Sequence, residues 1–176
     1  MKKTNDSQDW INKYLTDHMV YNTDTNSESY QCVLRFTLLW NLFEAQYLPK
    51  HCSFADIQKE AERLKPSGKI WKETLNCFII RYCGTAEKPP LVQIKELFED
   101  PEANLDHANT IRKKLLNDTD EKSNLSGCLA IIYRIRCNLF HGNKKLATIW
   151  NQGELFEHIN QFLICIMDDE SNKLRE

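Results

Sequence analysis

The chain has 176 residues, enough for one domain with a well-formed core, whereas two domains of this total length would each be small. Hydrophobic residues make up 41% and charged residues 27%, a composition that excludes a disordered chain and is typical of a globular one. The net charge of -2 and the pI near 6.2 argue against a broad polyanion-binding surface. We therefore treat residues 1–176 as a single domain in which any contact with nucleic acid is local.

Hydropathy and cysteine content indicate the compartment. No apolar run approaches the roughly 20 residues that span a bilayer, and the N-terminus lacks the apolar core of a secretory signal. The seven cysteines, an odd number without C-x-x-C spacing, indicate reduced and mostly buried thiols. We expect a cytoplasmic protein with no membrane partner. Neither the His51–Cys52 neighbours nor the pair Cys77 and Cys83 match a zinc-ligand spacing, so we expect no metal and no cofactor.

The pattern of breakers predicts an all-α fold, because the five glycines and five prolines fall between segments of helical periodicity. The first predicted helix is amphipathic and covers residues 8–20. The second covers 28–48 and stops at Pro49, and because it is apolar nearly all round we expect it at the centre of the fold. Ser53 is the predicted N-cap of a third helix that runs through Leu64.

The second half of the chain continues with helices that differ in polarity. Their predicted ranges are 69–83, 91–98, 106–117, 126–141 and about 154–167. Gly84 ends the first of these, and the next two are more charged and are expected at the periphery. Residues 168–176 are predicted to be a frayed tail. The tryptophans Trp40, Trp71 and Trp150 are interpreted as core residues rather than as platforms for base stacking.

Residues 128–142 read CLAIIYRIRCNLFHG, a helical run that two arginines interrupt and that a histidine and a glycine close. Arginine is almost never fully buried without a partner, so Arg134 and Arg136 have to face polar groups. A histidine beside arginines is suited to proton transfer next to a stabilised anion, and phosphate is the obvious anion. These residues are therefore our candidate site.

Helical geometry relates the members of this site. Arg134 and His141, seven positions apart, lie within about 20° of each other on an ideal helix, with Asn138 between them. Arg136 lies about 140° from His141 on the same wheel. Gly142 suggests that the helix ends near His141, which frees the imidazole to meet the long arginine side chain.

A polar stripe on the 28–48 helix offers partners for the arginines. Thr37, Asn41 and Glu44 follow one another at steps of four and three on an otherwise apolar surface. We hypothesise that Glu44 pairs with Arg136 or Arg134. The alternative is an internal hydrogen bond that joins two helices without a catalytic purpose.

The segment Arg136-Cys137-Asn138-Leu139-Phe140-His141 resembles the R-x4-H signature of HEPN domains, and Arg134 to His141 also fits the longer R-x6-H spacing. The earlier stretch FTLLWNLFEAQYL is similar to the corresponding HEPN helix. The resemblance implies that this chain folds as a compact helical bundle with extra peripheral helices. It also implies a homodimer that brings two motifs to a shared cleft. It also implies a metal-independent endoribonuclease that serves as a toxin or antiviral defence effector, with an antitoxin or regulatory protein as a further partner.

The residues are consistent with that chemistry, because RNA carries its own nucleophile, the 2′-hydroxyl. In the resemblance-based interpretation His141 is the general base or acid and Arg136 holds the phosphate. The supporting residues are Arg134, Asn138, Glu44 and Asn41, and the residues that guide the RNA backbone are Lys144 and Lys145.

Two positions depart from the family pattern. Cys137 stands where a polar residue commonly follows the arginine, and Asn143 stands where some HEPN toxins carry a tyrosine that their antitoxin modifies. The resemblance therefore gives no support for regulation by tyrosine modification. Two other interpretations remain open: a non-catalytic HEPN-like module that binds RNA, nucleotide or protein, and an unrelated helical scaffold in which the arginines form salt bridges.

Overall fold

The computed structural model describes residues 28–50, 52–64, 69–92, 94–97, 105–117, 119–140 and 152–173. Every regular element in these ranges is a helix, which confirms the predicted all-α class. The elements are α2 (Glu28–Tyr47), α3 (Phe54–Arg63), α4 (Ile70–Phe78), η1 (Ile79–Cys83), α5 (Ile94–Leu97), α6 (Leu105–Leu115), α7 (Glu121–Phe140) and α9 (Gly153–Lys173). The predicted helix over residues 8–20 lies outside the described residues.

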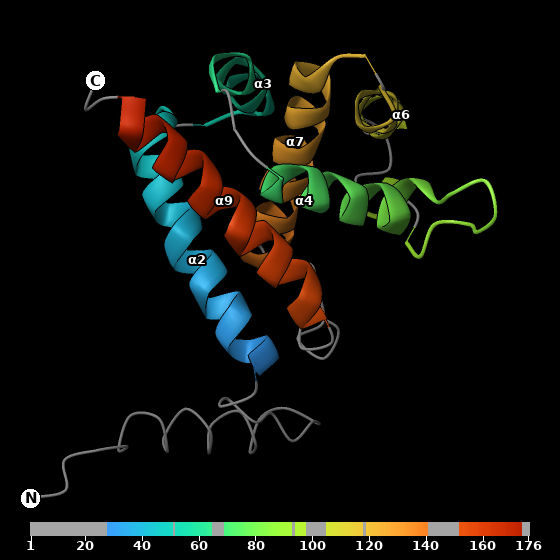
Figure 1. Ribbon diagram of the computed structural model, residues 1–176, viewed down its shortest axis with the longest axis horizontal. Helices are drawn as coiled ribbons and strands as arrows, with labels where there is room; N and C mark the ends of the chain where they lie inside the picture. Colours follow the sequence, from blue (N-terminus) through green and yellow to red (C-terminus); the bar gives the residue numbers. More distant parts are fainter. Residues whose placement is uncertain are drawn as a thin grey trace, which may run out of the picture.

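The helices form a bundle with α7 at its centre (Figure 1). Helices α3, α4, α5 and α6 pack against α7, and α4 also packs against α9. Helices α2 and α9 lie side by side and run in the same direction, because Ser29 adjoins Gly153 and the side-chain nitrogen of Asn160 donates to the carbonyl of Cys32 at 3.0 Å. This arrangement brings the second half of α2 close to the second half of α7.

The expected central position of the 28–48 helix is wrong, because α7 is the helix at the centre. Residues 124–132 of α7 are all buried, whereas α2 buries one face and exposes another. The exposed face carries Leu34, Leu38 and Leu42, which are 44%, 62% and 47% exposed. These leucines are four residues apart and share one stripe of the helix. This stripe is not covered by the described residues, and the apolar composition of α2 alone could not distinguish it from a buried one.

The start of α3 follows the prediction at Ser53. The Ser53 hydroxyl accepts the backbone N–H of Asp56 at 3.3 Å, and the Asp56 carboxylate accepts the backbone N–H of Ser53 at 2.8 Å. This reciprocal pair satisfies two amide donors that the first turn of a helix leaves free. The Ser53 hydroxyl, which also donates to the Asp56 carboxylate at 2.6 Å, and then the Ser53 backbone N–H hold the pKa of Asp56 below its usual value.

The predicted helix over residues 69–83 changes character at its midpoint. Its first part is the α-helix α4, and its second part is the π-helix η1, whose wider turn is closed by a bond from the Gly84 amide to the Ile79 carbonyl at 2.9 Å. Gly84 ends the segment as predicted, with φ of 74° and ψ of -177°. Such backbone angles are almost confined to glycine.

Two helices are longer than predicted. Helix α7 begins at Glu121 instead of residue 126, because the Asp120 carboxylate accepts the Lys122 amide at 3.0 Å and starts the first turn. Asn124 in this extra segment is buried, and its side chain donates to the carbonyls of Lys114 and Leu115 at the end of α6. A buried polar residue can thus be required where two helices meet. Apolar periodicity alone therefore did not predict that α7 begins before residue 126.

The end of the chain differs in the same way. Helix α9 continues to Lys173, so residues 168–173 are helical and the prediction of a frayed tail from residue 168 is wrong for them. Helix α5, in contrast, has four residues where eight were predicted.

The core contains large aromatic side chains from several helices. Trp40 and Trp71 are 0% and 3% exposed, which confirms them as core residues, while Trp150 lies outside the described residues. Trp40 lies against Phe43 and Tyr133, with ring centroids 5.6 Å and 6.1 Å away. None of the described helices is long and apolar enough to cross a membrane.

Candidate functional site

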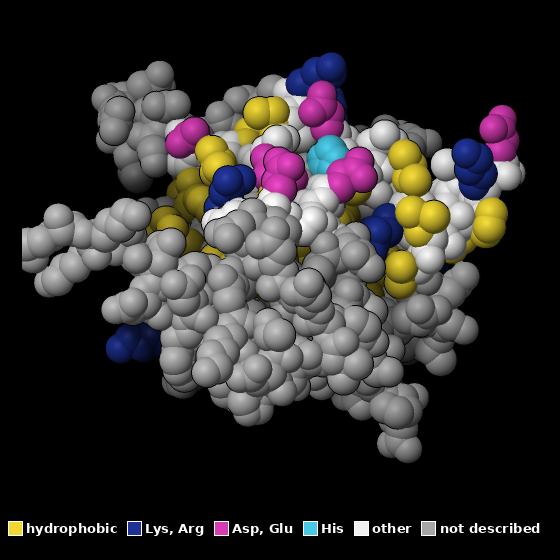
Figure 2. Space-filling view, turned by 90° about the horizontal axis from the view of Figure 1, so that it is seen from below, with side chains coloured by type: hydrophobic (Ala, Val, Ile, Leu, Met, Phe, Trp, Pro, Cys, Tyr) yellow, Lys and Arg dark blue, Asp and Glu magenta, His cyan; other side chains and the backbone are white. Residues whose placement is uncertain are grey.

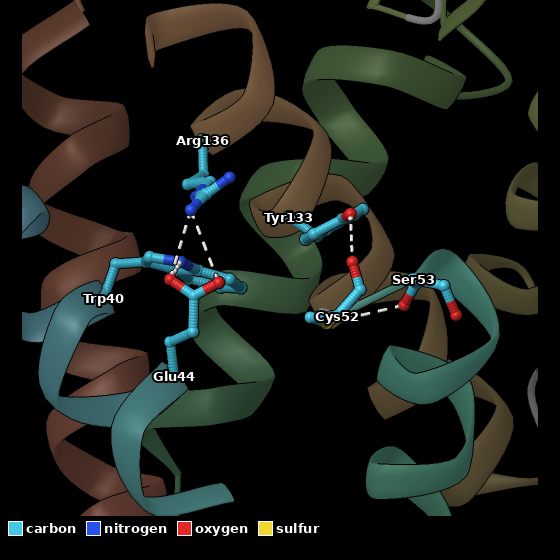
Figure 3. Close-up of polar contacts among 6 residues, drawn as sticks. All are labelled: Trp40, Glu44, Cys52, Ser53, Tyr133 and Arg136. Carbon is cyan, nitrogen blue, oxygen red and sulfur yellow. Dashed lines mark hydrogen bonds and ion pairs between the residues drawn. The ribbon is translucent and has the colours of Figure 1, made fainter. Parts of the chain in front are cut away.

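The centre of the candidate site is an ion pair between α2 and α7. The Nη2 atom of Arg136 lies 3.2 Å from Oε2 and 3.3 Å from Oε1 of Glu44, as Figure 3 shows. Trp40, one turn earlier on α2, donates its indole N–H to the same carboxylate at 3.1 Å. The pairing of Glu44 with Arg136 is therefore confirmed as a contact. Both side chains of the pair are about one-quarter exposed, at 27% and 26%.

The rest of the Arg136 side chain is fixed from two sides. Its guanidinium carbon lies 5.3 Å from the centroid of the Phe140 ring, one turn further along α7. Its Nε atom is buried and donates no hydrogen bond. Because Nη2 is used by Glu44, an incoming phosphate would meet Nη1 and the outer edge of Nη2 rather than the Nε edge.

Arg134 and Asn138 contact a different neighbour. Arg134 Nε donates to the carbonyl of Leu97 at 3.0 Å, and Asn138 Nδ2 donates to the same oxygen at 2.8 Å. Leu97 is the last residue of α5, where helix carbonyls have no partner within the helix. Asn138 is 5% exposed, so this bond is a buried one. Arg134 and Asn138 therefore hold α5 against α7.

The two arginines thus lie on different sides of α7. Two residues two apart on an α-helix are separated by about 200°, so side chains at 134 and 136 reach different neighbours. The structure places Arg134 toward α5 and Arg136 toward α2. We predicted that Arg134 supports Arg136 at a phosphate, and the described contacts of Arg134 instead serve the packing of the bundle.

The predicted polar stripe on α2 reaches α7 at one position. Thr37 donates its hydroxyl to the backbone carbonyl of Leu34 at 2.7 Å, within its own helix. Asn41 is exposed, and Glu44 makes the contact with Arg136. Asn41 therefore lies on the same helix as Glu44 but outside the ion pair.

Sequence reasoning missed Tyr133 and the role of Cys52 beside this pair. The Tyr133 hydroxyl donates to the Cys52 carbonyl at 3.0 Å, immediately before the start of α3 (Figure 3). Burial, and secondarily the neighbouring Cys137, raises the pKa of Tyr133 to about 12. Tyr133 precedes Arg136 by three positions, and this helical spacing is the signal that places both on one face of α7.

The Cys52 thiol shares the same electrostatic surroundings. Its burial, followed by the carboxylates of Asp56 and Glu44, raises the pKa of Cys52 to about 11, although Arg136 acts in the opposite direction. A thiol with such a pKa is protonated at neutral pH and is a poor nucleophile. All seven cysteines are free thiols. Cys52 is therefore a weak candidate for nucleophilic chemistry beside the Glu44–Arg136 pair.

The remaining predicted site residues, His141, Lys144 and Lys145, lie outside the described residues. Helix α7 is described to Phe140, one residue before His141, close to the predicted end. Among the residues that the structure describes, no group of three or more His, Cys, Asp or Glu side chains could hold a metal ion. The described part of the site consists of a guanidinium, its carboxylate partner and their aromatic neighbours.

Comparisons with known proteins identify no relative of this chain. No protein-family model, no curated protein and no solved structure matches it.

Proposed function

We propose that this chain is a HEPN-like, metal-independent endoribonuclease that cleaves RNA by transesterification at the 2′-hydroxyl. The observation that supports this proposal most is the position of Arg136 near the end of α7, partly exposed and held by Glu44. It lies in an all-helical bundle, five positions before His141, as the R-x4-H pattern requires. We further propose that the enzyme acts in the cytoplasm as a toxin or antiviral defence effector and that an antitoxin or regulatory protein controls it.

The proposed reaction needs a proton acceptor, a proton donor and a cation. His141 removes the proton from the 2′-hydroxyl, and the 2′-oxygen attacks the adjacent phosphorus. The bond from phosphorus to the 5′-oxygen breaks, and that oxygen receives a proton from solvent water as it leaves, while the proton held by His141 passes to solvent. Arg136 holds the phosphate and stabilises the additional negative charge through Nη1 and the outer edge of Nη2. The products are a 2′,3′-cyclic phosphate and a 5′-hydroxyl end. Lys144 and Lys145, which follow His141 in the sequence, guide the backbone of the RNA.

Glu44 has a defined part in this proposal as a positioning residue. Its carboxylate accepts from both Trp40 and Arg136, so the guanidinium has a fixed orientation before RNA arrives. Its negative charge also offsets part of the positive charge that attracts phosphate. Removal of that charge is expected to strengthen RNA binding while it loosens the geometry needed for cleavage.

The decisive experiment is cleavage of labelled single-stranded RNA by the purified full-length chain in excess EDTA. The active-site variants are Arg136→Ala, Arg136→Lys and His141→Ala, and Arg112→Ala on α6 is the matched control because that arginine is exposed. Circular dichroism and thermal unfolding check the fold of each variant. The proposal expects cyclic-phosphate products from the wild type and the control, and a loss of at least 100-fold in the three site variants.

Equal cleavage by all variants would contradict the assignment, because the activity would then come from another site or a contaminating nuclease. The ion pair also favours a second function, a non-catalytic module that binds RNA, because Glu44 already occupies Nη2 of Arg136. That alternative predicts RNA binding without cleavage, and weaker binding by Arg136→Ala. Absence of both binding and cleavage would favour a helical scaffold in which this pair is structural.

The resemblance also leads us to propose a homodimer. Sedimentation equilibrium tests it, because a dimer has twice the 20.7 kDa mass of the chain. A dimer that dissociates together with its cleavage activity would link assembly to the shared cleft. A monomer with full activity would contradict that link.

A further inference from the structure

A cavity of about 530 Å³ lies between α4, η1 and the start of α9, and it shares no lining residue with the Glu44–Arg136 site. Small-molecule sites in proteins have volumes of about 300–1,000 Å³. Figure 2 shows the lower face of the molecule, where acidic side chains gather around a histidine and apolar side chains lie beside them. The cavity therefore has the size and the mixed lining of a ligand site.

Two oppositely charged side chains that line this cavity, Arg81 and Glu154, form no ion pair with each other. Arg81, from η1, has a buried Nε atom without a hydrogen bond, and its guanidinium lies 5.8 Å from the centroid of the Tyr82 ring. Glu154, from the first turn of α9, is exposed. Among the described residues, the ion pairs include neither Arg81 nor Glu154.

The third charged wall residue behaves differently. The Glu73 carboxylate of α4 lies 3.4 Å from the ammonium group of Lys69, the N-cap residue of that helix, so its charge already has a partner. Arg81 and Glu154 line the same cavity, and no ion pair among the described residues joins them. The Arg81 side chain is hydrogen-bonded to that of Tyr82, but the ion pairs among the described residues give it no carboxylate. A ligand carboxylate would give this guanidinium a charged, bidentate partner.

The remaining lining is apolar and partly accessible. Ile80 is 43% exposed and Leu91 is 71% exposed, while Leu155 is buried at 3%. Ile80 and Arg81, consecutive residues of the π-helical turn, both line the cavity. An apolar group that covers Ile80 and Leu91 would remove their surface from water, which is favourable.

We propose that this cavity binds a small zwitterion with an apolar body, an α-amino acid with a large apolar side chain. The carboxylate of the ligand pairs with Arg81, its ammonium group pairs with Glu154, and its side chain covers Ile80 and Leu91. The inference stands on the cavity and its separated charges, and it is independent of the proposed ribonuclease activity.

The test is isothermal titration calorimetry of the full-length chain with L-phenylalanine. Three analogues each lack one feature: N-acetyl-L-phenylalanine has no ammonium group, L-phenylalanine amide has no carboxylate, and glycine has no apolar body. We expect saturable binding of L-phenylalanine and at least tenfold weaker binding of each analogue. Absence of saturable binding overturns the proposal. Equal binding of the acetylated compound or of the amide also overturns it, because a simple anion or cation site would then suffice.

Variants locate the site on this chain. Arg81→Gln and Glu154→Gln are each expected to weaken L-phenylalanine binding at least tenfold. The matched controls Arg112→Gln and Glu62→Gln are exposed and lie outside the cavity, and they should bind as the wild type does. Arg81→Lys preserves the charge if the glutamine variant fails to fold. Wild-type affinity in folded Glu154→Gln would place any binding elsewhere and overturn the assignment.

Discussion

Glu44 of α2 and Arg136 of α7 are 92 positions apart along the chain, and Nη2 of the arginine lies 3.2 Å from Oε2 of the glutamate. Because each side chain is about one-quarter exposed, water screens the pair less than a surface pair but still reaches it. The same carboxylate also accepts from Trp40, so the charge on α2 is fixed before Arg136 meets it. The pair therefore fixes where the candidate catalytic arginine lies.

We predict a coupling free energy of about 1 kcal/mol between Glu44 and Arg136. A double-mutant cycle with Glu44→Gln, Arg136→Gln and the double variant measures it by urea unfolding. The glutamine at position 44 can still accept from Trp40, which isolates the charge. The exposed Lys69–Glu73 pair of α4 is the control, with an expected coupling of about 0.3–0.5 kcal/mol. Coupling at 44 and 136 no larger than in this control would show that the pair contributes little to the fold.

The shared carbonyl of Leu97 gives a second prediction. Asn138→Ala removes one of its two described donors and should lower the free energy of unfolding by about 1–2 kcal/mol. Asn138→Asp should cost more at pH 7, because it places a carboxylate oxygen against the carbonyl oxygen in a buried position. Urea unfolding of both variants measures the difference. An Asn138→Ala variant as stable as the wild type would mean that the donor at position 138 is not needed.

The same variants bear on function. If Asn138 acts through packing alone, Asn138→Ala should retain cleavage of RNA under conditions in which it is fully folded. A loss of kcat without a loss of folded protein would instead return Asn138 to the supporting role that the sequence suggested. Cleavage assays at a temperature well below both unfolding midpoints distinguish these outcomes.

The capping pair of Ser53 and Asp56 predicts a dependence of stability on pH. Its hydrogen bonds hold the pKa of Asp56 below the unfolded value of about 3.9, so its stabilising effect is present above that pH. The effect is lost as the pH falls through the lower, folded value. Asp56→Asn should therefore unfold at lower urea concentration than the wild type at pH 7, and the difference should shrink below pH 4. Asp120→Asn is a comparison at another helix start, and a constant difference at both pH values would contradict the assignment.

Much of the fold could be predicted from local sequence signals. Ser53 and Gly84 have conformations and hydrogen bonds that depend on near neighbours, so their positions mark helix ends before any tertiary contact is known. The centre of the bundle could not be predicted in this way. Leu34, Leu38 and Leu42 are apolar like a core stripe, and the exposure of that stripe depends on where distant helices pack.

The candidate site likewise contains contacts that the sequence could predict and contacts that depend on how distant helices pack. The need for a polar partner at Arg136 follows from the energy of an unpaired charge, and Glu44 was a candidate because it interrupts an apolar helix. The contact of Arg134 and Asn138 with Leu97 could not be foreseen, because it depends on the end of a four-residue helix. Helical spacing correctly put these two on one face but gave no indication of what that face meets.

Gly84 provides the last prediction, because its backbone closes the π-helix and turns into the segment that carries Leu91. With φ of 74° and ψ of -177°, a side chain there is strained, and an added Cβ would lie 2.7 Å from both the Lys88 oxygen and the Pro90 nitrogen. Gly84→Ala should lower the free energy of unfolding by at least about 1–3 kcal/mol, the usual cost of this backbone region for other residues. Urea unfolding measures the loss, with Glu87→Ala, an exposed position in the same segment, as the control. Since Arg81 and Leu91 flank Gly84, the alanine variant should also weaken L-phenylalanine binding under folded conditions, whereas unchanged stability would mean that this turn relaxes without cost.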